Sequence, residues 1–133
     1  PNEVDVAVEL VDERLAKGEA SGYHFVFAER QGQVVGYACF GPIPCTCFSY
    51  DLYWIAVHEG QRHGGVGRRL LDASEQAIAG LGGQRIYVET ASREQYAPTR
   101  AFYERCAYGV EAVLADFYAP GDSKVMFVKV VGS

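Results

Sequence analysis

The distribution of apolar residues along the first half of the chain predicts one helix followed by three strands. The apolar residues of segment 3–17 recur at helical spacing and Gly18 lies just beyond them, so this segment is predicted to be an amphipathic helix. Segments 23–30 and 33–40 are rich in β-branched and aromatic residues and are joined by a Gln-Gly pair, which predicts a β-hairpin. Segment 50–57, YDLYWIAV, predicts a third strand.

The second half of the chain predicts alternating helices and strands. After a glycine-rich segment, one helical face is apolar at Val66, Leu70, Ala73, Ala77 and Leu81, and the other is polar at Arg69, Asp72 and Glu75. The remaining predicted elements are a strand at 85–91, a short helix from Pro98 to before Gly109, and a hairpin of strands 111–118 and 124–131. This order predicts an α/β fold of the α+β type, in which helices pack on a mixed sheet, as a single domain over residues 1–133.

Composition narrows the functional classes. The chain carries a net charge of −5 and four cysteines in no paired arrangement, and no segment resembles a signal peptide or a membrane span. We therefore expect a cytoplasmic protein that associates with no membrane. Cys45 and Cys47 resemble the start of a metal site, but no second pair of ligands follows at zinc spacing, so no metal is expected.

The charge is unevenly distributed along the sequence. Residues 1–61 carry nine acidic and three basic residues, whereas residues 62–105 carry seven basic and five acidic ones. The acidic balance of the whole chain argues against nucleic-acid binding, and the confined basic segment favours a small anionic ligand. The acidic N-terminal part also favours a cationic substrate, such as a polyamine, an aminoglycoside-like amine or a lysine side chain.

The segment HEGQRHGGVGRRLL, residues 58–71, carries the clearest chemical signal. Glycines that open a helix expose backbone amides to a ligand, and the helix dipole adds positive charge at the same place, so phosphate is the expected ligand. Arg62, His63 and Arg68 add side-chain donors. The alternative is a plain glycine-rich loop with solvated arginines. The Walker pattern is absent, because no Gly-Lys-Ser or Gly-Lys-Thr follows.

A dinucleotide-binding fold is a second interpretation of these glycines. Gly65 and Gly67 have its spacing, and Glu89 lies 22 residues beyond Gly67, where a ribose-binding acid is expected. Leu70 occupies the place of the third glycine, however, and the connection from the strand at 50–57 to the glycines is longer than the tight turn of that fold. The predicted hairpins at both ends also fit that fold poorly.

Together these motifs resemble the GNAT superfamily of acetyl-CoA-dependent N-acetyltransferases. The segment RHGGVG matches the family's pyrophosphate loop with Arg62, Gly65 and Gly67. WIAV before it resembles the family's bulged strand, and AFYERCAYG resembles its late helix. The resemblance spans about residues 33–131. It implies the acyl-CoA N-acyltransferase fold, a central and mostly antiparallel sheet whose middle strands splay apart and which helices flank.

The resemblance implies acetyl-CoA as the co-substrate and direct attack of a primary amine, from a small molecule or a peptide, on the thioester carbonyl. Pantetheine is expected to pair with the backbone of Ile55 and Val57. The residues expected to bind the cofactor at the turn are Arg62, His63, Gly64, Gly65, Val66, Gly67 and Arg68, with the amides of 63–68 holding the pyrophosphate. A non-catalytic CoA-binding sensor or scaffold is the alternative function.

Three residues are candidates for the catalytic steps. Tyr103 matches the family's tyrosine on the late helix, which protonates the departing thiolate, and a packed core aromatic is the alternative. An amine must lose its proton before it attacks, and Glu89 is the first candidate for the base and Asp51 the second, although either is equally an exposed strand charge. Tyr50 and Tyr53 are candidates for lining the acceptor pocket.

The chain departs from the family pattern in two respects. Tyr96 stands where many members carry an asparagine that contacts pantetheine, so that contact is not carried over. The family's first strand and helix are not evident in the sequence, so we expect an N-terminally truncated domain in which the strand at 24–30 is an exposed edge. A homodimer is compatible with the family, in which dimers are frequent.

Overall fold

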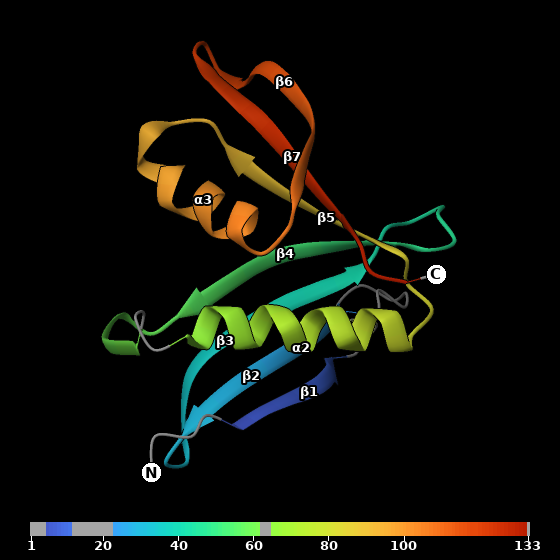
Figure 1. Cartoon of the computed structure of the whole chain (residues 1–133), viewed down its shortest axis with the longest axis vertical. Helices are drawn as coiled ribbons and strands as arrows, with labels where there is room; N and C mark the ends of the chain where they lie inside the picture. The colour runs from blue at the N-terminus through green and yellow to red at the C-terminus, as the bar shows by residue number, and fades with distance from the viewer. Residues whose placement is uncertain (1–4, 12–22, 62–64, 133) are drawn as a thin grey trace.

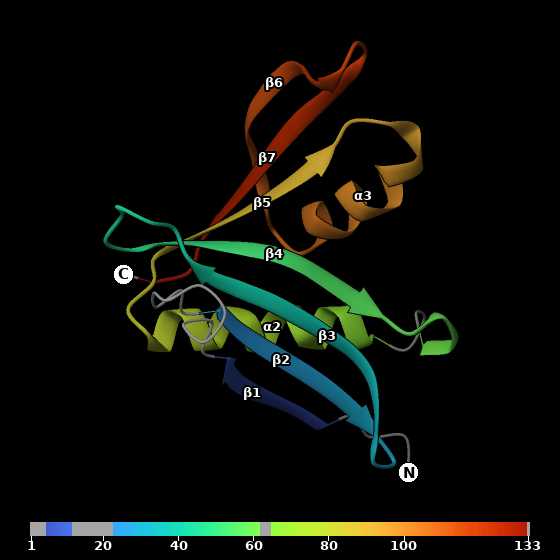
Figure 2. The ribbon, with the colours of Figure 1, turned by 180° about the vertical axis from the view of Figure 1, so that it is seen from behind.

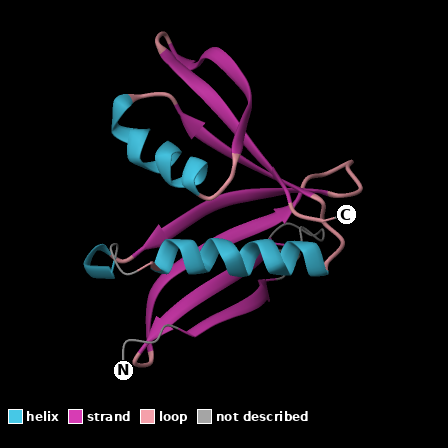
Figure 3. Cartoon of the chain, viewed as in Figure 1, coloured by secondary structure: helices cyan, strands magenta, loops and turns pink. Residues whose placement is uncertain are grey.

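The structure, a computed structural model, describes residues 5–11, 23–61 and 65–132. Within them, seven strands form one sheet in the order β1-β2-β3-β4-β5-β7-β6 (Figure 1). The elements in chain order are β1 (Asp5–Val11), β2 (Tyr23–Arg30), β3 (Gln33–Pro42), β4 (Ser49–Val57), η1 (Glu59–Gln61), α2 (Val66–Gly80), β5 (Arg85–Ala91), η2 (Glu94–Tyr96), α3 (Ala97–Arg105), β6 (Gly109–Ala119) and β7 (Asp122–Val130). Neighbouring strands are antiparallel except for β4 and β5, which are parallel. The predicted mixed, mostly antiparallel sheet with flanking helices is confirmed (Figure 3).

The helix predicted over 3–17 is wrong, because residues Asp5–Val11 form strand β1. This strand pairs with β2 in antiparallel register along its whole length. The expectation that the family's first strand is missing, with the strand at 24–30 left as an exposed edge, is therefore also wrong: β2 lies between β1 and β3. Residues 12–17 of the predicted helix lie outside the described residues.

β4 and β5 run side by side at one end only. Their parallel pairing covers residues 49–51 of β4 and 85–87 of β5. Beyond that point the two strands diverge, since β4 stays with β3 and β5 stays with β7 (Figures 1 and 2). β4 also carries one extra residue, Tyr53, relative to β3, which makes it a bulged strand. The splayed middle strands and the bulged strand that the resemblance implied are both present.

α2 packs on the face of the sheet that β1 to β4 form. Val66, Leu70 and Ile78 on the inner side of the helix are completely buried, and burying an aliphatic side chain of this size contributes about 1.5–3 kcal/mol. Gly36 on β3 permits the close approach, because a Cβ atom there would lie 2.9 Å from the carbonyl oxygen of Ala56 and 3.1 Å from Leu70 Cδ1. This packing fixes the N-terminus of α2 beside β4.

α3 is anchored to the end of β5 and to the core. Arg100 donates hydrogen bonds to the carbonyl oxygens of Ala91, at 2.7 Å, and of Arg93, at 3.0 Å. The ring of Tyr103 packs against that of Phe127 on β7, with 6.0 Å between centroids. The position of Tyr103 is therefore set by both strands on the far side of the splayed region.

A network of polar groups joins α2, β7 and the turn after α3. Glu75, on the face of α2 predicted to be polar, has a side chain that is only 13% exposed. It accepts a hydrogen bond from the Tyr108 hydroxyl at 2.9 Å and forms an ion pair with Lys129 Nζ at 3.0 Å. Lys129 also donates to the carbonyl of Cys106 at 3.1 Å. β7 thus supplies this polar-face residue with a charged partner, which the helical periodicity does not reveal.

None of the four cysteines forms a disulfide: Cys39 and Cys106 are buried, and Cys45 and Cys47 are exposed. Among the described residues, no three His, Cys, Asp or Glu side chains are placed to hold a metal ion together. Each helix in the part of the chain that the structure describes is too short or too polar to cross a membrane.

Candidate active site

The N-terminus of α2 presents backbone amides without partners inside the helix. Gly65 caps the helix with φ of 77°, a left-handed conformation that other residues rarely adopt, and as a glycine it has no side chain that could bond to the first-turn amides. The amide of Arg69 donates to the Gly65 carbonyl at 3.1 Å, so the amides of Val66, Gly67 and Arg68 have no intrahelical acceptor. Combined with the helix dipole, this arrangement is suited to binding an anion.

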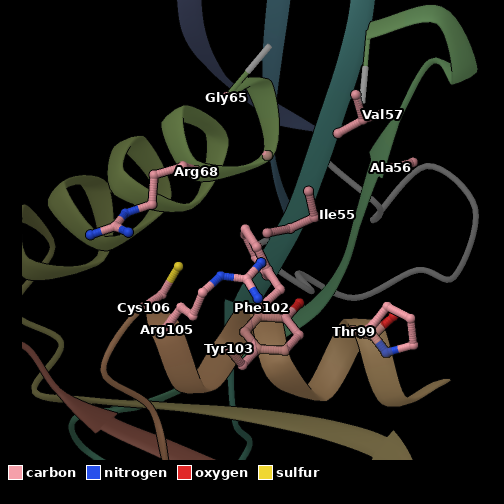
Figure 4. Close-up of a pocket in the computed structure, with 12 residues that line it drawn as sticks. Ile55, Ala56, Val57, Gly65, Arg68, Thr99, Phe102, Tyr103, Arg105 and Cys106 are labelled. Carbon is pink, nitrogen blue, oxygen red and sulfur yellow. The ribbon is translucent and has the colours of Figure 1, made fainter. Parts of the chain in front are cut away.

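A cavity of about 780 Å³ lies between the N-terminus of α2, α3 and β4, and we call it the α2–α3 cavity (Figure 4). β4 lines it with residues 55–57, which lie beyond the last residue paired with β5. The backbone amides and carbonyls on that edge of β4 are therefore available to an extended ligand. A glycine widens the space, since a Cβ atom on Gly67 would come within 3.6 Å of the Phe102 ring.

Most of the residues predicted to bind the cofactor meet at this cavity. Ile55, Val57, Gly65, Gly67 and Arg68 line it. The side chain of Val66 is instead fully buried in the core, so its contribution is confined to its backbone amide. Arg62, His63 and Gly64 lie outside the described residues.

Two arginines line the α2–α3 cavity from different helices. Arg68 forms an ion pair with Asp72, with 3.6 Å between Nε and Oδ1, and its guanidinium points along α2 (Figure 4). Arg105 extends into the cavity (Figure 4). Sequence reasoning missed Arg105, because a basic residue in the last turn of a helix is ordinarily explained by the helix dipole. Both side chains favour an anionic ligand.

A second cavity, of about 440 Å³, has aromatic walls. Tyr53 and Trp54 of β4, together with Tyr96 and Tyr118, contribute the rings, and we call it the aromatic cavity. The bulge in β4 allows the consecutive residues Tyr53 and Trp54 to line the same space. Of the two tyrosines predicted for an acceptor pocket, Tyr53 lines this cavity, whereas Tyr50 packs against the hydrophobic core.

The two cavities share Ile55, Thr99 and Tyr103 as lining residues. Tyr103 is 4% exposed. Its burial, and to a lesser degree the neighbouring Cys106, raises the pKa of Tyr103 to about 12. The hydroxyl therefore keeps its proton at neutral pH. A protonated hydroxyl between two cavities can donate its hydrogen to a group that spans them.

The two carboxylates predicted as bases are placed differently. Glu89 lines the aromatic cavity and forms an ion pair with Lys124, with 2.6 Å between Oε1 and Nζ. Asp51 lines neither of the two cavities. Burial, followed by the charge of Glu89, raises the pKa of Asp51, while Lys124 opposes the shift. The structure thus brings Glu89, and not Asp51, into a cavity with Tyr103.

The Acetyltransferase (GNAT) family has a sequence profile that matches residues 3–108. Among solved structures, a protein from Desulfovibrio desulfuricans assigned to the GNAT family of acetyltransferases is 37% identical in sequence. The two structures superimpose with a TM-score of 0.87, and the match covers 96% of this chain and 99% of that one. No protein with a curated function matches the sequence significantly.

Two more distant structures share the fold. The ribosomal-protein-S18-alanine N-acetyltransferase of Escherichia coli is 13% identical, with a TM-score of 0.75 over 97% of this chain and 96% of that one. An aminoglycoside 6′-N-acetyltransferase, solved with coenzyme A, is 21% identical, with a TM-score of 0.72 over 82% of this chain and 73% of that one. At these identities the similarity establishes the architecture alone.

Proposed function

The chain belongs to the GNAT family of acetyltransferases, and from this membership we propose that it transfers an acetyl group from acetyl-CoA to a primary amine of a small molecule or peptide. One observation carries the proposal: the α2–α3 cavity, at the N-terminus of α2, and the aromatic, carboxylate-bearing cavity share the buried side chain of Tyr103 as a lining residue. The names of two similar folds, an aminoglycoside N-acetyltransferase and a ribosomal-protein-alanine N-acetyltransferase, support small molecules and peptides as acceptor classes.

Three features of the α2–α3 cavity support acetyl-CoA as its ligand. The first-turn amides of α2 would hold the pyrophosphate, and Arg105 adds positive charge nearby. The unpaired edge of β4 at Ile55 and Val57 would hydrogen-bond to pantetheine as a further strand would. Acetyl-CoA supplies the acetyl group as a reactive thioester. The predicted contribution of residues 62–64 stays a prediction.

We assign Tyr103 the role of hydrogen donor to the thioester sulfur as the carbon–sulfur bond breaks. Its pKa of about 12 keeps the hydroxyl protonated. A thiol of ordinary pKa, about 8.5, is the stronger acid, so the hydroxyl stabilises the developing thiolate chiefly by donating a charge-assisted hydrogen bond. This favours the transition state more than the ground state, which is what lowers the barrier.

We assign Glu89 the role of accepting the proton that the ammonium form of the acceptor must lose. Its carboxylate belongs to the aromatic cavity, which Tyr53 and Trp54 also line. Asp51 receives no catalytic role, because it lines neither cavity. The amine would thus enter through the aromatic cavity and meet the thioester near Tyr103.

The proposal is tested by measuring acetyl-CoA binding by calorimetry and thiol release in the presence of a panel of primary amines. Tyr103→Phe should lower kcat by roughly 10²- to 10⁴-fold and leave acetyl-CoA affinity unchanged. Tyr108→Phe is the matched control, because it also removes a buried phenolic hydroxyl but Tyr108 lines neither cavity.

The outcomes separate the alternatives. Equal loss of kcat in Tyr103→Phe and Tyr108→Phe would refute the assigned role of Tyr103. Saturable acetyl-CoA binding without turnover of any amine would indicate a CoA-binding sensor or scaffold. Absence of acetyl-CoA binding would refute the assignment of the α2–α3 cavity.

A further inference from the structure

We propose that Asp122 and Thr90 form a second recognition site inside the aromatic cavity, which binds an ammonium group at the far end of the acceptor, so that the preferred acceptors are diamines. The inference rests on the proposed function, because it takes the aromatic cavity to hold the acceptor.

Two buried oxygen atoms belong to residues that line the aromatic cavity. Thr90 and Asp122 are each 7% exposed, and both line the aromatic cavity. Thr90 Oγ1 and Asp122 Oδ1 are buried and form no hydrogen bond within the described part of the chain. Buried polar atoms in folded proteins are nearly always paired, and leaving a charged one unpaired is costly. Two such atoms in the lining of one cavity point to a ligand that supplies the missing donors.

The position of Asp122 is fixed by its neighbours. The Ser92 amide donates to the Ser123 carbonyl at 2.9 Å, and the Ser123 amide donates to Ser92 Oγ at 2.8 Å, so the end of β5 is tied to the start of β7. Arg93 Nε lies 3.0 Å from Asp122 Oδ2. One carboxylate oxygen is therefore engaged and the other is left for a ligand. A site held in this way loses little conformational entropy on binding.

An ammonium group suits the two unpaired atoms. It carries three N–H donors and no acceptor, so it supplies the kind of donor that Asp122 Oδ1 and Thr90 Oγ1 both lack. A ligand carboxylate would be repelled by Asp122, and an alkyl end would leave both oxygens unpaired.

The surroundings of the site also favour a cation. The ionised groups that line the aromatic cavity are two carboxylates, Glu89 and Asp122, against one guanidinium, Arg93. Lys124 forms an ion pair with Glu89 from outside the lining. Aromatic faces attract cations, and the Arg93 guanidinium already lies 5.2 Å from the centroid of the Tyr96 ring.

The test compares diamines with monoamines of the same length. Diaminobutane, diaminopentane and diaminohexane are each paired with the monoamine in which a methyl group replaces the second amino group, namely pentylamine, hexylamine and heptylamine. In the wild-type protein, kcat/KM for the best diamine should exceed that of its partner by about tenfold or more, the factor that corresponds to 1.4 kcal/mol.

Two substitutions locate the selectivity. Asp122→Asn should reduce the diamine preference to nearly one while leaving kcat/KM for the monoamine unchanged within a few-fold. Thr90→Val, which removes only the hydroxyl, should reduce the preference by less. Glu94→Gln is the control for charge, because Glu94 is an acidic residue near this end of β5 that lines neither cavity, and it should keep the full preference. If thermal unfolding shows that Asp122→Asn does not fold, the diamine preference of Thr90→Val tests the proposal, and an unchanged preference would overturn it.

Calorimetric titration of the CoA-saturated protein with each amine distinguishes this inference from the proposed function. Diamine binding that Asp122→Asn or Thr90→Val weakens, without any turnover, would support the recognition site and refute the acetyl transfer. Turnover of monoamines and diamines at equal kcat/KM would support the acetyl transfer and overturn the recognition site. A diamine preference that survives both substitutions would overturn it as well.

Discussion

Gly65 allows the stability of α2 and the binding of an anion to be changed in opposite directions by a single charge. Its φ of 77° disfavours most side chains, but a Cβ atom there would meet nothing within 4 Å, so the obstacle is conformational rather than steric. Asn and Asp tolerate this conformation better than other residues and have nearly the same size. Gly65→Asn and Gly65→Asp therefore differ from one another essentially by one negative charge.

The two effects of that charge can be estimated. A carboxylate at a helix N-terminus is stabilised by the dipole by about 0.3–1 kcal/mol, so the Asp variant should have the larger free energy of unfolding. Against a bound pyrophosphate the same charge is repulsive. Two unit charges 4 Å apart interact by about 1 kcal/mol in bulk water and about 4 kcal/mol at an effective dielectric constant of 20. CoA affinity should accordingly be roughly fivefold to 700-fold lower in the Asp variant than in the Asn variant.

Urea denaturation and calorimetric titration with CoA, both in the same buffer at low salt, measure the two quantities. The expected result is a higher free energy of unfolding together with a weaker affinity for the Asp variant. Equal CoA affinity in the two variants would show that no phosphate group binds beside Gly65. A lower free energy of unfolding for the Asp variant would refute the helix-dipole argument. Raising the salt concentration should shrink both differences, because exposed charges are screened.

Three further predictions concern the carboxylates and the buried tyrosines. Glu89→Gln should lower kcat/KM for the acceptor by roughly 10²- to 10⁴-fold, the contribution of a general base, whereas Asp51→Asn should leave it unchanged, as steady-state kinetics would show. Asp51→Asn should also not lower the free energy of unfolding at neutral pH, since burial disfavours that carboxylate; urea denaturation checks this. Burial raises the pKa of Tyr103 to about 12, and it also raises the pKa of Tyr108. Above pH 10 the folded protein therefore keeps phenolic protons that the unfolded chain releases. The free energy of unfolding should therefore fall as pH rises above 10, by about 1.4 kcal/mol per pH unit for each tyrosine, and a double Tyr-to-Phe variant should show a flatter decline in urea denaturation. Glu75→Gln should destabilise the protein by about 2 kcal/mol, because it leaves the half-buried ammonium of Lys129 without a counter-charge. Thermal unfolding checks this, and a double variant that also removes the Lys129 ammonium should recover part of the lost stability.

Local sequence patterns correctly predicted those elements that pack against segments adjacent to them in the chain. The hairpin of β2 and β3 and the helix that begins beside Gly65 follow from residues next to one another in the chain. Segment 5–11, DVAVELV, satisfies both a helical spacing and a two-residue alternation, and pairing with β2 decides between them. Periodicity alone cannot make that choice for so short an apolar run.

The candidate site divides in the same way. The end of the site at the N-terminus of α2 was predictable, because a glycine turn and a helix N-terminus carry their chemistry locally. The sequence indicated Tyr53, Glu89 and Tyr103 of the aromatic cavity but not its other walls, because those come from segments that meet through the sheet order. Tyr118 and Asp122 belong to the last hairpin, and no pattern within that hairpin indicates that it folds back beside the end of β5. The choice between Glu89 and Asp51 likewise depends on where the two middle strands part.

The divergence of β4 and β5 leaves the sheet with unpaired backbone groups in its middle as well as at its outer strands. An extended ligand that pairs with the free edge of β4 would occupy the place of an eighth strand, so occupancy and folding are thermodynamically linked. Such linkage stabilises the folded protein by about 2.7 kcal/mol when the ligand is present at 100 times its Kd. The apparent melting temperature of this protein would then rise with the concentration of its co-substrate. The bound ligand would also join the part of the sheet that ends at β4 to the part that begins at β5 while the reaction takes place between them.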